Sequence, residues 1–199
     1  SMPSRSSSAV TSPSAWSCCT ERGYARPVLY QPEAHEQLTD EEWNEERVRA
    51  AIRSIVAETE DAFDDGWDAR HRTVYSGGAG IVDALRRLSD RGLVDLRREY
   101  VSYLERSLEE PPDFPDENPR GSLFFGEVGI RLALQRLAPS PENLDELSAR
   151  IQENARDERR ELMWGSPGTM HAARELGLDD LWAESAEWLL GERDEDGLW

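Results

Sequence analysis

The chain has 199 residues, of which 38% are hydrophobic and 32% are charged, enough for one domain with a buried core. Acidic residues outnumber basic ones by 41 to 23, and the net charge of -18 argues against nucleic acid or an anionic membrane as a partner, because both attract basic protein surfaces. No stretch approaches the roughly 18–20 apolar residues that cross a bilayer, so we expect a soluble protein.

Residues 1–38 are expected to form a disordered, serine-rich leader and an extended segment, because they hold too few apolar side chains to offset the entropy of ordering. The two cysteines of the chain, Cys18 and Cys19, are adjacent in this leader, and neighbouring cysteines rarely bridge. The lack of a disulfide framework favours a cytoplasmic location. The remaining residues, 39–199, are expected to form one repeat domain.

Helical periodicity begins near Thr39, which forms a capping-box pattern with Glu42. Apolar residues then recur at helical spacing as far as Phe63, and a break is expected at residues 64–66. This pattern predicts a first helix, which precedes the repeats in the sequence.

A glycine-rich turn at residues 75–80 precedes an apolar pattern that predicts a helix, which Gly92 is expected to end. The spacing of apolar residues predicts another helix from Leu93 to Leu108. The proline-rich run 111–119 must be a loop, because proline lacks a backbone donor and clashes with a preceding helical turn.

The same order of elements then recurs. The expected elements are a turn and helix over 125–137, a helix over 144–159, a turn and helix over 164–176 and a last helix over 181–190. Ser140 or Asn143 is expected to cap the second of these, and Gly177 to end the third.

Three glycine pairs align at these turns: Gly77/Gly80, Gly126/Gly129 and Gly165/Gly168. Four residues after each second glycine stands an alanine, and a large aromatic residue lies at or just before each turn. The spacings of 49 and 39 residues suit a two-helix unit with variable loops. We expect the first glycine to adopt a backbone conformation closed to other residues, and the second to let the helix approach a neighbour closely.

This repeat predicts an all-α fold of helix pairs in which slim helices lie inside and longer, more charged helices lie outside. That arrangement is an α/α toroid, here incomplete. The alternative is an ordinary helical solenoid whose helices are capped by glycine.

The repeat motifs of residues 75–81, 123–134 and 161–173 resemble those of lanthionine synthetase C-like (LanC-like) proteins, notably in the strings Phe-Phe-Gly-Glu-Val-Gly-Ile and Glu-Leu-Met-Trp-Gly-Ser-Pro-Gly-Thr. The resemblance covers roughly residues 40–199 and implies the first three repeats, or amino-terminal half, of an (α/α)6 or (α/α)7 toroid. It also implies the family's activity, the addition of a thiol to a dehydroamino acid, which forms lanthionine or another thioether or adds glutathione.

In that family zinc activates the thiol and is held by two cysteines and a histidine in Cys-His-Gly-type motifs of later repeats. No such motif occurs here, so the resemblance implies no metal ligand or cofactor in this chain, although zinc is expected in a full-length member. The chain is expected to be inactive alone. Its expected partners are a peptide substrate, the missing carboxy-terminal repeats, or a second copy that meets it at the open edge of the toroid.

His171 and Asp83 are the candidate catalytic residues, because they occupy the same position three residues after the second glycine of their repeats. That position could line a central cavity and supply an acid or a base. Leu132 at the same position of the second repeat argues against a polar cavity there, and a capping or packing role is the alternative interpretation of His171. Glu127 and Glu161 stand beside two of the turns, where a helix amino terminus stabilises an acid.

Two other functions remain open. A non-catalytic helical-repeat module that binds a peptide or protein would expose an apolar edge unless it were capped or dimerised. A fragment of a carbohydrate-active toroid would need a pair of carboxylates, and no pair stands out from the general surface charge.

Overall fold

The computed structural model describes residues 42–64, 71–117 and 120–197. The chain divides into two units, residues 1–43 and 44–199, so the second unit begins five residues after the expected domain start. The predicted leader, with Cys18 and Cys19, lies outside the described residues. In the described part all regular elements are helical, which confirms the all-α class. They are α1 (Glu45–Asp64), α2 (Gly78–Asp90), α3 (Val101–Glu109), the 3-10 turn η3 (Pro115–Glu117), α4 (Glu127–Leu137), α5 (Pro141–Asn154), α6 (Ser166–Leu176) and α7 (Asp179–Gly191).

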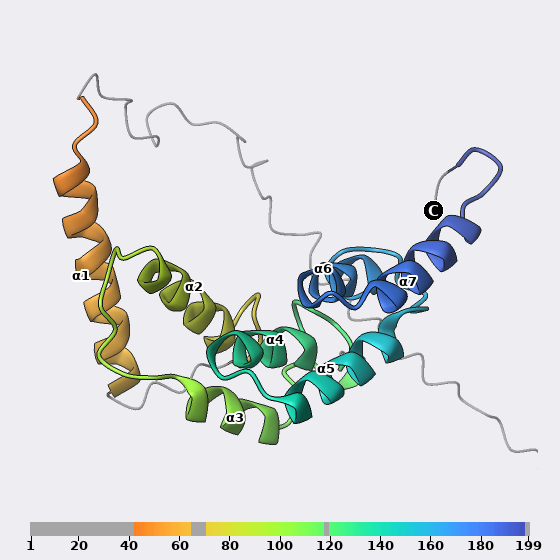
Figure 1. Ribbon diagram of the computed structural model, residues 1–199, viewed down its shortest axis with the longest axis horizontal. Coiled ribbons are helices and arrows are strands. Elements are labelled where there is room, and N and C mark those ends of the chain that lie inside the picture. Colours follow the sequence, from red (N-terminus) through yellow and green to blue (C-terminus); the bar gives the residue numbers. More distant parts are fainter. Residues whose placement is uncertain (1–41, 65–70, 118–119, 198–199) are drawn as a thin grey trace, which may run out of the picture. The chain divides into compact units, whose positions relative to one another are not determined.

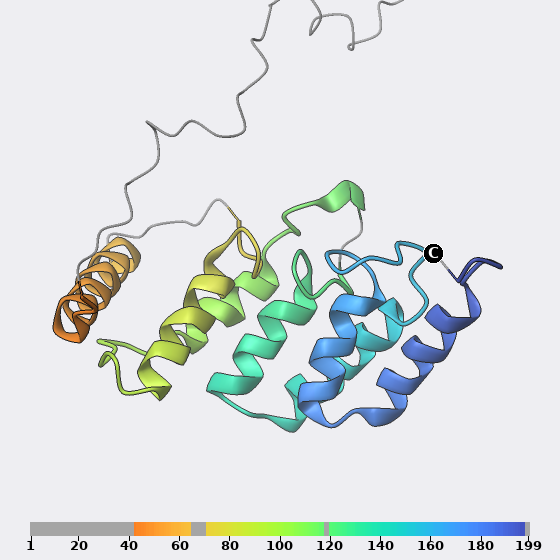
Figure 2. The same ribbon diagram turned by 90° about the horizontal axis from the view of Figure 1, so that it is seen from above.

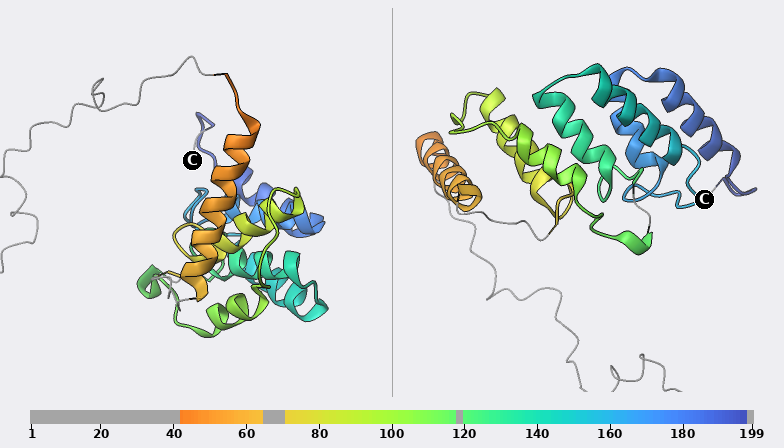
Figure 3. Two further views of the ribbon diagram at one scale, coloured as in Figure 1. Left: turned by 90° about the vertical axis from the view of Figure 1, so that its left-hand side faces the viewer. Right: turned by 90° about the horizontal axis from the view of Figure 1, so that it is seen from below.

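The helices after α1 form two layers (Figure 1). One layer holds α2, α4 and α6, with α4 packed against both of the others, as Figure 2 shows from above. The second layer holds α3, α5 and α7, and α5 packs against α4 and α6 (Figure 3). We call the first three the inner helices. The described residues thus form a helical repeat of paired helices, as the glycine pattern predicts.

The core follows this layering in two parts. The first lies between α1, α2, α3 and α4 and is centred on Val82, Leu104 and Ile130. The second lies between α4, α5 and α6 and is centred on Leu147 and Ile151, with Ala172 and Ala173 of α6 fully buried against it. Alanines at these two positions keep α6 thin enough to lie close to its neighbours.

Helix α1 begins at Glu45, so the predicted capping box is wrong: Glu42 lies outside the helix, and Thr39 lies outside the described residues. The side chain of Asn44 instead accepts a hydrogen bond from the Arg47 N–H at 2.9 Å, which satisfies one of the free donors of the first turn. The cap expected for α5 does form, since Ser140 Oγ accepts from the Asn143 N–H at 3.1 Å.

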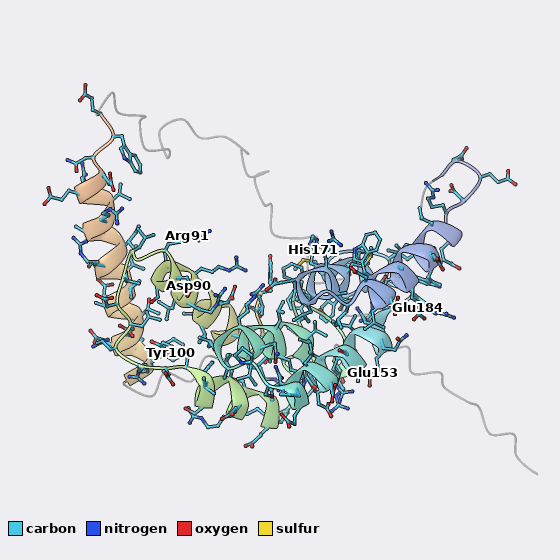
Figure 4. The ribbon with its side chains drawn as sticks, in the orientation of Figure 1. Asp90, Arg91, Tyr100, Glu153, His171 and Glu184 are labelled. Atoms are coloured by element: carbon cyan, nitrogen blue, oxygen red, sulfur yellow. The ribbon has the colours of Figure 1, made fainter. Side chains whose placement is uncertain are left out.

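The predicted helix over residues 93–108 is wrong in its first half, because α3 begins only at Val101. Gly92 ends α2 with a φ of 64°, and the chain then runs without helix to Tyr100. The buried carboxylate of Glu60 on α1 accepts hydrogen bonds from the Arg97 N–H at 2.9 Å and the Tyr100 hydroxyl at 3.1 Å. These bonds, and the burial of Tyr100 against α1 (Figure 4), replace those of a helix.

Burial, together with the hydrogen bond to Glu60, raises the pKa of Tyr100 to about 12. The hydroxyl therefore stays protonated and continues to donate to Glu60 well above neutral pH. This contact fastens α1 to the segment that precedes α3.

Two other boundaries differ from expectation. Helix α5 ends at Asn154 rather than at Arg159, and the Asn154 side chain donates to the Trp164 carbonyl at 3.2 Å instead. The prediction that each outer helix is the longer of its pair fails for the first pair, because α3 has 9 residues and α2 has 13. Among the described residues, no helix is both apolar enough and long enough to reach across a bilayer.

Candidate functional site

The three glycine turns lie next to one another at one end of the inner helices. The Tyr75 N–H in the first turn donates to the Phe124 carbonyl in the second at 3.1 Å. Ser122 Oγ in the second turn donates to the Met163 carbonyl in the third at 2.6 Å. Segments some 40 to 50 residues apart in sequence are therefore hydrogen-bonded neighbours.

The first glycine of each pair is the residue that caps its helix, but not for the reason expected. Gly77, Gly126 and Gly165 have φ angles of -136°, -125° and -91°, which residues with side chains also adopt. The expectation of a closed backbone conformation is wrong at these positions. Positive φ values in the described part of the chain occur at Gly92, Gly177 and Gly197 instead.

The glycines are required because a side chain at these positions would have no space. A Cβ on Gly77 would overlap the carbonyl oxygen of His71, and a Cβ on Gly165 would overlap that of Arg159, in each case six residues earlier. The second glycines repeat the relation, also at six residues. The pairs are Gly80 with Val74, Gly129 with Leu123 and Gly168 with Leu162. Each turn therefore folds back over the first turn of its own helix.

The second glycine also receives a side chain from the preceding repeat. A Cβ on Gly129 would lie 2.6 Å from Val74 Cγ2, and one on Gly168 would lie 3.5 Å from Leu123 Cβ. Val74 and Leu123 occupy the same position in their turns. One aliphatic residue per turn thus packs over the glycine of the next repeat.

A polar side chain at one further position holds the second and third turns in shape. Ser122 Oγ accepts from the backbone N–H groups of Phe124 and Phe125 at 3.2 and 3.0 Å. At the same position of the third turn, the Glu161 carboxylate accepts from the N–H groups of Met163 and Trp164 at 2.7 and 2.6 Å. Glu161 thus binds N–H groups of the turn itself.

Aromatic side chains link the same turns. The rings of Phe125 and Trp164 stack at 4.4 Å between centroids, and Phe114 meets both edge-on at 5.2 and 5.5 Å. Tyr75 contacts Phe125 at 5.1 Å, and 64% of its surface is exposed. The aromatic residue expected beside each turn therefore belongs to one continuous cluster.

A pocket of about 320 Å³ opens between the three inner helices, and both candidate catalytic residues line it. Asp83 comes from α2 and His171 from α6, while Leu132 lies between them on α4. The shared sequence position therefore corresponds to one shared face. Leu132 is buried and apolar, whereas His171 is exposed, at the place marked in Figure 4.

One arginine ties the three inner helices together beside this pocket. Arg136 of α4 donates from Nη1 to Asp83 of α2 at 2.7 Å and from Nε to Glu175 of α6 at 2.6 Å. Arg87 donates to the same Asp83 carboxylate at 2.7 Å. Sequence reasoning missed this network, although Arg87, Arg136 and Glu175 share a position one helical turn after that of Asp83 and His171.

The network keeps its acids ionised. Burial disfavours the charge on Asp83, but hydrogen bonds and charges from Arg87 and Arg136 outweigh it and hold its pKa below the ordinary value. The hydrogen bond from Arg136 likewise lowers the pKa of Glu175. Asp83 is therefore an anion at neutral pH and suits positioning rather than the donation or abstraction of a proton.

Glu127 is a second charged centre, on the other side of α4. Its buried carboxylate accepts from Arg120 Nε at 3.0 Å and from Arg150 Nε at 3.1 Å. Burial disfavours its charge, yet these arginines lower its pKa. It lies in the first turn of α4, where an acid is stabilised, and it joins α4 to α5.

Comparison with known proteins assigns no family. No family model, curated protein or solved structure matches this chain. Its chemistry must therefore be judged from its own residues.

The zinc site of the LanC-like family has no counterpart in the described ranges, where no three His, Cys, Asp or Glu side chains gather as metal ligands do. His71 stacks on Phe114 at 5.7 Å, and His35 and both cysteines lie outside those ranges. The side chains of the described residues do not fit zinc.

Proposed function

We propose that the chain forms the amino-terminal repeats of a LanC-like α/α toroid and supplies one wall of its peptide-binding cavity. The observation that carries the proposal is the common face of the inner helices, where Asp83, Leu132 and His171 line one pocket from equivalent positions. A toroid places that face toward its axis. The family's thiol addition to dehydroamino acids would need zinc-bearing repeats that this part of the fold does not supply.

The pocket suits an extended peptide better than a rigid small molecule. Its lining includes the apolar Leu123, Phe124 and Leu132 and the charged Asp83 and Arg136. A volume of about 320 Å³ accommodates one or two side chains of a peptide. Exposed Tyr75 lies on the turn that contributes Val74 to the same pocket.

Binding to the full chain tests the proposal. A fluorescein-labelled peptide with one dehydroalanine is compared, by fluorescence anisotropy, with the same peptide carrying alanine. We expect tighter binding of the dehydroalanine peptide, and a loss of about tenfold in the Asp83→Asn variant. Asp145→Asn on the exposed face of α5 is the matched control and should bind normally.

The outcomes separate the alternatives. Equal affinity for both peptides would favour a general peptide-binding repeat module without family chemistry. No binding by the folded chain would contradict both readings. A glutathione adduct on the dehydroalanine peptide, detected by mass spectrometry with the chain alone, would overturn the view that these repeats are inactive by themselves.

A further inference from the structure

The outward face of α6 differs from the equivalent faces of α2 and α4. In α2 this face carries Ala79 and Val82, exposed by 0% and 1%; in α4 the equivalent residues are Val128, exposed by 0%, and Arg131. Ala79, Val82 and Val128 are each covered within a hydrophobic core. The equivalent residues of α6 are solvent-accessible. They are Pro167 and Met170, with His171 beside them, spaced to lie on one side of the helix.

A groove of about 590 Å³ lies along this face. Pro167, Met170 and His171 of α6 form one side, and Trp182 and Leu189 of α7 form the other. Trp182, one of two tryptophans on α7, remains 40% exposed in this groove. The groove is therefore largely apolar, with Arg160 and Arg174 also in its lining, and is bounded by two helices.

The turn before α6 also carries an exposed apolar residue at a position that is covered in the other turns. Val74 packs over Gly129, and Leu123 packs over Gly168. Leu162 is the third member of this series, yet it is 45% exposed, whereas Leu123 is 9% exposed. The aliphatic residue at this position packs over a glycine of the next repeat in the first two turns, but it is exposed in the third turn.

We infer that the groove between α6 and α7 is a docking site for an amphipathic helix that begins with a Gly-x-x-Gly turn, the inner helix of a further repeat. A helix docked there would continue the series of two interfaces already present, α2 with α4 and α4 with α6. The second glycine of the docked helix lies over Leu162, because a larger residue would collide there as it would at Gly129. The inference rests on the repeat geometry and needs no catalytic assignment.

The same continuity specifies one polar contact. Arg136 stands seven residues after the second glycine of its repeat and reaches Asp83, three residues after the second glycine of the preceding repeat. The corresponding residue of the docked helix reaches His171. An acid at that position accepts a hydrogen bond from the imidazole, whereas an arginine is repelled whenever His171 is charged.

A peptide from this chain provides the probe. Residues 73–90 include the first glycine turn and α2, contain no tryptophan, and are used with Arg87→Glu to offer the acid. Titration into the full chain is followed by the indole N–H resonance of Trp182, assigned with Trp182→Phe. We expect saturable binding, with the unmodified Arg87 peptide several-fold weaker and a Gly80→Leu peptide at least tenfold weaker.

Two variants, each with a substitution at an exposed residue, show where the peptide binds. Leu162→Asp should weaken it at least tenfold, while Ile55→Asp on α1, a residue that is 64% exposed, should leave it unchanged. Circular dichroism checks that both variants fold. No saturable shift of the Trp182 resonance, or equal binding by the two variants, would overturn the inference.

A second copy of the chain is the competing occupant. If sedimentation shows a dimer that Leu162→Asp dissociates and that the peptide does not displace, a second copy covers the groove and the inference is wrong. Because the peptide contains neither cysteine nor a dehydroamino acid, its failure to bind would leave the proposed peptide-binding cavity untouched.

Discussion

The two junctions between inner helices differ from the groove at α6 in what covers the aliphatic residue of each turn. Val74 and Leu123 lie over glycines of the next repeat, whereas Leu162, at the same position, is 45% exposed. Packing between repeats and within each turn therefore explains why the glycines recur at equivalent positions in this chain. The difference also gives three equivalent sites at which the same substitution should have different consequences.

Gly129 should be the most sensitive position. A Cβ there would overlap the Leu123 carbonyl oxygen and lie 2.6 Å from Val74 Cγ2, and the backbone oxygen cannot turn away. We expect Gly129→Ala to lower the free energy of unfolding by about 4 kcal/mol, the upper end for single substitutions. Urea denaturation measures this value.

Gly191→Ala at the end of α7 is the matched control, because nothing lies within 4 Å of a Cβ added there. Its stability should be unchanged or slightly raised, since alanine favours helix over glycine by up to about 1 kcal/mol. Similar losses at the two glycines would mean that close packing between repeats does not set the requirement for glycine.

Leu123 tests the covered side of the comparison. Its side chain is buried between the second turn and Gly168, so Leu123→Ala removes core contacts and leaves a cavity. We expect a loss of about 2–3 kcal/mol in the free energy of unfolding. A loss below about 1 kcal/mol, measured by the same denaturation, would show that this junction is not tightly packed.

Arg136 tests the polar side of the same junctions, because it bridges Asp83 and Glu175 across three helices. Arg136→Met should cost about 1–2 kcal/mol at neutral pH, since it removes the arginine shared by the half-buried Asp83, which keeps only Arg87 and Arg86, and by the exposed Glu175. Arg156→Met, which breaks an exposed pair with Glu184, is the control and should cost clearly less than Arg136→Met.

The pH dependence follows from the same carboxylates. The folded-state pKa values of Asp83 and Glu175 lie below their ordinary values, so the network stabilises the fold above about pH 4 and this contribution is lost as the pH falls further. We expect Arg136→Met to flatten the decline in unfolding free energy between about pH 5 and pH 3. An unchanged slope would mean that the network does not couple these acids to folding.

Leu162 should give the smallest effect. Because the side chain is already 45% exposed, Leu162→Ala is expected to change the free energy of unfolding by less than about 0.5 kcal/mol. A loss as large as that of Leu123→Ala would indicate that Leu162 is buried in solution and would remove the contrast between the open and covered positions.

The repeat was predictable because its signals are local. Glycine pairs at fixed offsets mark where α2, α4 and α6 begin, and helical spacing places Asp83 and His171 on equivalent faces. The reason for the first glycine of each pair was not predictable. A Cβ on Gly77 would collide with a carbonyl oxygen six residues earlier, and only the fold of the turn places that oxygen there.

Contacts between distant residues account for the other differences. The helix expected from Leu93 fails because Glu60, more than 30 residues earlier, binds the backbone and side chain of Arg97. The ion pairs of Arg136 with Asp83 and Glu175 could not be predicted either, because charged residues at helical spacing are most often solvated. Only the packing of α2, α4 and α6 brings these three residues together.

The packing of each turn over the next repeat's glycine can be tested most directly by nuclear Overhauser effects in the isotope-labelled full chain. The account predicts cross-peaks from the Val74 methyl groups to the α protons of Gly129, and from the Leu123 side chain to those of Gly168. Well-resolved spectra of the folded protein in which both cross-peaks are missing would contradict it.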